Sequence, residues 1–99
     1  MEFYICSTNC GDDDEINVLL RTYPQIEEYN PLIKEYQCDW GKGQVYTKKG
    51  LFIELNSLEE LVGFSNKIGK KLIINDNYAM YDMKHNPLNT IEIYDGWRE

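Results

Sequence analysis

The stretch that organises the chain is LFIELNSLEELVGFSNKIGKKLIIND, residues 51–76. It predicts a strand, a helix and a second strand in succession. Leu51, Ile53 and Leu55 fall on one face at period two, which is typical of a strand with one buried face. Residues 72–74 form a short apolar run that suits a buried strand, and the Asn-Asp-Asn that follows predicts a turn.

The helix between these strands has clear boundaries. Ser57 stands at the N-cap position, and Glu60 three residues later completes a capping box. Gly69 ends the helix, because glycine enters the left-handed region without a Cβ penalty. The apolar stripe expected to face a sheet consists of Leu58, Leu61, Val62, Ser65 and Ile68.

The remaining chain predicts further short elements. A strand is expected around Phe3 and Ile5, and a helix near Asp13 or Asp14 that Pro24 interrupts. Residues 32–40 suit a strand, with a short helix over 31–36 as the alternative. The other expected features are a helical turn at 25–30, strands at 44–48, 78–83 and 90–94, and a turn or bulge at Lys49-Gly50.

This order predicts one α+β domain spanning residues 1–99. The expected fold is ferredoxin-like, of βαββαβ type: an antiparallel sheet with two helices on one face and extra C-terminal strands. In such a sheet Tyr4, Thr90, Glu92 and Tyr94 alternate with the core residues and are expected to point outward.

Composition narrows the class of protein. The 99 residues are 42% hydrophobic, which favours a folded domain over disorder. No apolar run approaches the roughly 18 residues of a membrane span. The N-terminus lacks the features of a signal peptide, so the expected location is the cytoplasm, and the three cysteines are expected to be free thiols.

The charge is strongly negative. Seventeen acids against ten bases give a formal net charge of −7. An acidic surface repels phosphate backbones, which argues against direct nucleic-acid binding. It also favours encounter with basic protein surfaces, including the grooves of nucleic-acid enzymes, although solubility alone is the commoner reason for such a charge.

A zinc or thiol site is one alternative. Cys6, Cys10, Cys38 and His85 make up a Cys₃His ligand set, but only the first two cysteines are closely spaced. The acidic run 12–15 lacks the spacing of a calcium loop and is better explained as a helix N-terminus. No cofactor is expected.

Aromatic residues are abundant, with eight tyrosines and two tryptophans. Tyrosine and tryptophan are enriched at protein interfaces, and acids among them suit a basic groove in the manner of a DNA mimic. Glu54 and Glu92 are expected to make the outer sheet face acidic. The full set of expected partner-binding residues is Glu27, Glu28, Tyr46, Glu54, Glu92, Tyr94, Asp95, Trp97 and Glu99.

The segments LEEL (58–61), GKKLIIN (69–75) and TIEIYDGWRE (90–99) resemble small proteins of bacteriophages and prophages of Gram-positive bacteria. The resemblance implies an inhibitor of a host or defence enzyme, with anti-CRISPR proteins as the best-known class, working in the host cytoplasm. It carries over no catalytic residue.

The sequence therefore predicts a non-enzymatic protein that binds and inhibits a bacterial nucleic-acid enzyme. Two other hypotheses stay open. One is a small zinc- or thiol-dependent protein, and the other is a homo-oligomeric module, such as a homodimer, whose tyrosines pack against a second copy.

Overall fold

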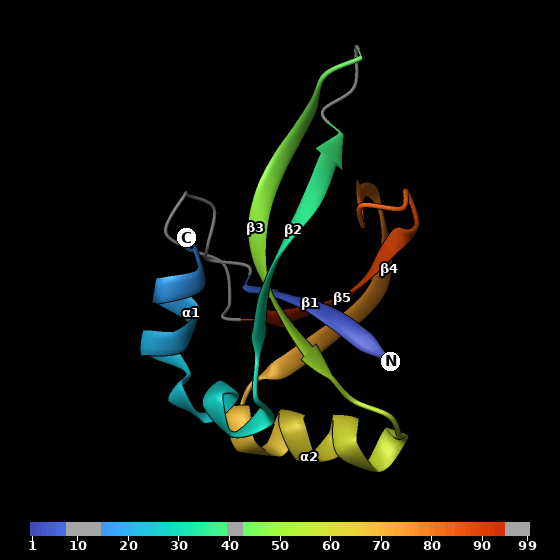
Figure 1. Cartoon of the computed structure of the whole chain (residues 1–99). Helices are drawn as coiled ribbons and strands as arrows, with labels where there is room; N and C mark the ends of the chain where they lie inside the picture. The colour runs from blue at the N-terminus through green and yellow to red at the C-terminus, as the bar shows by residue number, and fades with distance from the viewer. Residues whose placement is uncertain (8–14, 40–42, 95–99) are drawn as a thin grey trace, which may run out of the picture.

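The computed structural model describes residues 1–7, 15–39 and 43–94, with the side chains of 75–79 left out (Figure 1). Asp95, Trp97, Glu99 and Cys10 lie outside the described residues. The elements in chain order are β1 (Glu2–Ser7), α1 (Glu15–Thr22), the 3₁₀ helix η1 (Pro24–Tyr29), β2 (Leu32–Asp39), β3 (Val45–Glu54), α2 (Leu58–Ile68), β4 (Lys71–Tyr81) and β5 (Pro87–Tyr94).

The strands close into a five-stranded barrel in the order β1-β3-β2-β4-β5. β1 pairs antiparallel with β3 and parallel with β5, and the other neighbours are antiparallel. The prediction of an open ferredoxin-like sheet is therefore wrong, although the α+β class is confirmed. Figure 1 shows the β2–β3 hairpin projecting from the barrel on the side away from α2.

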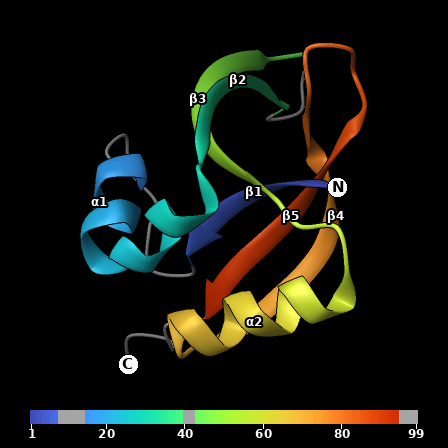
Figure 2. The same cartoon turned by 60° about the horizontal axis from the view of Figure 1, so that its bottom comes forward.

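The strands of the barrel bury side chains on both faces. The outer face of β1, β3 and β5 carries Phe3, Ile5, Leu51, Ile53, Ile91 and Ile93. Leu19 of α1, Ile26 of η1 and Phe64 of α2 pack on this face. The helices therefore cover the outside of the barrel, and Figure 2 shows α2 lying across one end of it.

The opposite face encloses a second, smaller cluster. Tyr4, Tyr36, Phe52 and Leu88 are buried there, with Cys6, Cys38 and Met80 packed against them. All five strands contribute to this cluster, so it fills the inside of the barrel. The outward orientation predicted for Tyr4 and Thr90 is wrong, because they are 4% and 3% exposed on this inner side.

The helix α2 has the predicted ends but a different buried stripe. The Ser57 side chain accepts the Glu60 N–H at 3.1 Å, and Gly69 has φ 74°. Phe64 and Ile68 are the buried residues. Leu58 and Val62 are exposed, because the stripe turns toward Phe64, which the prediction left out.

The observed bounds of the strands decide three local predictions. Residues 32–39 form a strand, as the first alternative held. β4 continues through 75–77 without a turn, with its register to β5 shifting between Asn77 and Tyr81. Gly50 lies inside β3 and makes neither a turn nor the start of a new strand.

No helix within the described ranges is both long enough and apolar enough to cross a membrane.

Candidate functional site

The barrel is closed between β2 and β4 by a very short ladder. Among the described residues, only Gln37 with Tyr81 and Cys38 with Met80 are paired. β2 continues from Tyr36 back to Leu32, where it pairs with β3 on one side but has no strand partner on the other within the described chain. We call the gap between residues 32–36 of β2 and residues 82–88 the seam.

The seam exists because β4 ends early. Asp82 follows the last strand residue, and its carboxylate accepts the backbone N–H groups of Lys84 at 2.8 Å and Asn86 at 2.9 Å. The Asn86 side-chain amide donates to the same carboxylate, and His85 adopts φ 67°. These bonds, led by that from the Asn86 N–H, hold the pKa of Asp82 below its ordinary value. The loop thus turns the chain into β5 before it can extend along β2.

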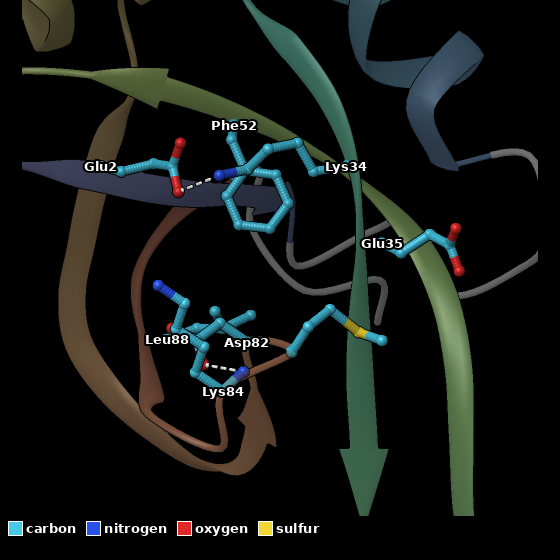
Figure 3. A pocket seen from close by; sticks show the side chains of 8 residues that line it. Glu2, Lys34, Glu35, Phe52, Asp82, Lys84 and Leu88 are labelled. Carbon is cyan, nitrogen blue, oxygen red and sulfur yellow. Dashed lines mark hydrogen bonds and ion pairs between the residues drawn. The ribbon is translucent and has the colours of Figure 1, made fainter.

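A cavity of about 440 Å³ occupies the seam (Figure 3). This volume falls within the roughly 300–1,000 Å³ of ordinary ligand sites. Phe52 and Leu88 of the inner cluster contribute its apolar wall. The complete lining is Glu2, Lys34, Glu35, Phe52, Asp82, Met83, Lys84 and Leu88.

The charges around the cavity differ in how they are satisfied. The Lys34 ammonium donates to Glu2 at 2.5 Å and lies 5.1 Å from the centroid of the Phe52 ring. The ion pair of Lys34 and Glu2 therefore has no net charge. Glu35 is exposed and makes no ion pair in the described part of the chain. Lys49 stands opposite Glu35 on β3, but no ion pair joins the two among the described residues. Glu35 is therefore the acid of the seam that a partner can pair with.

The two acids expected to define an acidic outer face lie far apart. Glu54 pairs with Glu2 at the start of β1, whereas Glu92 pairs with Cys6 near its end. Four residues of strand separate these points, about 13 Å. Both acids are on the face that lines the barrel, whose middle is filled by Tyr4 and Phe52. The open acidic face expected from the sequence is therefore absent from the described strands.

The other expected partner-binding residues that the structure describes are scattered. Tyr46 is exposed on β3, at the far end of the hairpin, and donates to Gln44. Tyr94 is half-buried at the end of β5. Glu27 is exposed on η1, and neighbouring Glu28 accepts from Lys67 at 3.0 Å. The structure does not gather these residues at one site.

The proposed zinc ligands are not brought together in the described residues. Cys6 and Cys38 both pack against the inner cluster. The His85 ring instead stacks on Tyr81 at 4.4 Å. No group of three or more His, Cys, Asp or Glu suited to a metal ion occurs among the described residues, and Cys10 falls outside them.

A hydroxyl pair lies inside the barrel. The Tyr4 and Tyr36 oxygens are 3.2 Å apart, and the Tyr4 hydroxyl also donates to Glu15 at 3.3 Å. Burial raises the pKa of both phenols, and the nearby Glu15 carboxylate adds to it. Both tyrosines are therefore neutral at physiological pH. They bind each other and hold the inner cluster together.

Sequence reasoning missed the seam residues. Lys34, Phe52 and Leu88 belong to no sequence motif. They line one cavity only because β4 ends where it does. One signal was present: Phe52 is a large apolar residue on the strand face opposite Leu51 and Ile53, which indicates burial on both faces.

No protein-family model, curated protein or solved structure matches the chain. The resemblance to phage proteins thus stays a hypothesis, and function must be argued from the site.

Proposed function

We propose that this chain is a non-enzymatic protein-binding domain whose partner presents a basic surface. The specific form of the proposal is the one expected from the sequence, inhibition of a bacterial nucleic-acid enzyme in the manner of phage anti-defence proteins. The observation that carries the binding role is the seam, where a strand edge whose backbone groups have no strand partner among the described residues borders a cavity.

An exposed strand edge promotes aggregation, because its unpaired backbone groups pair readily with other chains. Native proteins usually shorten or cover such edges. Here residues 32–36 are all on an edge, and the side chains of Leu32 and Ile33 are 56% and 57% exposed. Met83 on the opposite side of the seam is 58% exposed. Exposed apolar groups beside an unpaired edge are typical of a recognition surface.

The charge supports a basic partner. A net charge of −7 attracts a positively charged protein surface and speeds association, with a strong dependence on ionic strength. The same charge disfavours direct binding to DNA or RNA.

The experiment is a nuclease-treated pull-down from lysate of a bacterial strain with active CRISPR and restriction systems, followed by a cleavage assay with each retained enzyme. The proposal predicts retention of a nucleic-acid enzyme at low salt, its release at high salt, and stoichiometric inhibition of cleavage. Retained enzymes that cleave normally at saturating protein, or recovery of the bait alone, contradict it.

A further inference from the structure

We propose that the seam takes an extended peptide segment of the partner as an added β-strand, with basic side chains beside Glu35. This inference rests on the proposed function and names the binding mode and chemistry of the same site. The segment would run antiparallel to β2 and continue the line that β4 leaves after Tyr81.

The backbone of β2 supplies the first part of the argument. Residues 32–36 pair with β3 at Phe52 to Lys48, so the strand already has a regular extended geometry. Alternate residues of a strand direct their N–H and C=O groups to opposite sides, and on the seam side these groups have no strand partner in the described chain. A peptide strand about 4.8 Å away would satisfy them.

The side chains of β2 determine which kinds of residue the bound peptide should carry at its inward and outward positions. Leu32 pairs with Phe52, and Lys34 and Tyr36 therefore share its face, which is the inner one. A peptide residue pointing inward meets Phe52, Leu88 and Met83, which favours an apolar side chain. Peptide residues that point outward lie beside Ile33 and Glu35.

The charge of Glu35 determines which outward-pointing residues of the peptide are favoured. Opposite charges on directly facing strand residues stabilise a pair, and like charges destabilise it. Glu35 is exposed and has no ion pair among the described residues, although Lys49 stands opposite it on β3. Lys34, in contrast, is already neutralised by Glu2. Lysine or arginine beside Glu35 is therefore preferred over an acid, in agreement with the net charge of the chain.

The probes are two seven-residue peptides, Ac-TKVKVKT-NH2 and its acidic counterpart Ac-TEVEVET-NH2, titrated into ¹⁵N-labelled full-length protein. The inference predicts that the basic peptide shifts the amide signals of residues 32–36, 82–86 and 88 at millimolar or lower concentration. The acidic peptide should bind at least threefold more weakly. Equal binding of the two, or shifts elsewhere on the surface, overturns the inference.

Backbone pairing is tested by N-methylation of the basic peptide. Methylating alternate residues in one register removes the donors that face β2, whereas the complementary register methylates donors that face away. We expect one methylated peptide to lose at least tenfold in affinity and the other to bind within threefold. Equal effects in both registers contradict strand addition.

Variants of the protein complete the test. Glu35→Lys should weaken binding of the basic peptide at least threefold, and the matched control Glu27→Lys, on η1 and outside the cavity lining, should leave it unchanged. Concentration-dependent shifts of residues 32–36 without peptide would assign the edge to a second copy and overturn the inference. Enzyme inhibition that persists in Glu35→Lys, with no peptide binding, would refute this mode and leave the proposed function standing.

Discussion

The Tyr4 ring lies directly over Gly50, so that a Cβ atom at residue 50 would stand 2.6 Å from Tyr4 Cε1. The Tyr36 ring meets the same position at 2.9 Å. The two rings are 4.9 Å apart, and each also packs against Phe52. Gly50 therefore lets Tyr4 and Tyr36, from the two strands that flank β3, fill the barrel above β3, which explains a glycine within a strand.

Gly50→Ala should destabilise the fold by about 1–3 kcal/mol, because the buried rings have no room to retreat. Gly63→Ala is the matched control, since a Cβ there meets nothing within 4 Å. Alanine at that α2 position should add about 0.5–1 kcal/mol of stability. Urea denaturation measures both. Equal stability of Gly50→Ala and the wild type would mean that the tyrosines pack elsewhere.

The tyrosine pair predicts an alkaline transition. Burial raises the pKa of Tyr4 and Tyr36 above the ordinary value of 10.0. Since the neutral forms are favoured in the folded state, their stabilising contribution is complete below about pH 10 and is lost as the pH rises above it. In a titration followed at 295 nm, these phenols should ionise late, together with unfolding. Tyr4→Phe should reduce the late phase by one tyrosine, and an unchanged late phase would refute the assignment.

The Asp82 loop predicts a loss of stability in acid. Its pKa is lowered in the folded state, so its contribution is present above the ordinary value of 3.8 and lost as the pH falls through the folded pKa. Asp82→Ala should cost about 1 kcal/mol at neutral pH through the lost loop hydrogen bonds. The difference from the wild type should shrink at about pH 3. A deficit of equal size at both pH values would show that the carboxylate charge is irrelevant.

The local elements were predictable where a short-range rule acts. Ser57 and Gly69 mark the two ends of α2, because each forms a helix cap that involves only neighbouring residues. The strand at 90–94 followed from alternation in the same way, and it forms the end of β5. Both depend on the chain within a few residues, and so a single sequence is enough.

The barrel and the seam were not predictable in this way, because they depend on long-range pairing. Tyr4, Phe52 and Thr90 looked like the outer face of a sheet, yet together they form the inside of a barrel once β1 pairs with both β3 and β5. The seam also depends on the loop at Asp82, which ends β4. Asp82 belongs to no sequence motif. Glu54 is exposed and Glu92 is half-buried at the other end of β1, so long-range pairing also keeps these two acids from forming one outer acidic face.

The central claim is that residues 32–36 of β2 present an open edge that a partner strand pairs with. Amide hydrogen exchange of the ¹⁵N-labelled protein, free and with saturating Ac-TKVKVKT-NH2, tests it most directly. In the free protein, alternate amides of this segment should exchange fast and the amides paired with β3 slowly, and the peptide should protect the fast ones at least tenfold. Uniform protection in the free protein, or fast exchange that the peptide leaves unchanged, would contradict the account.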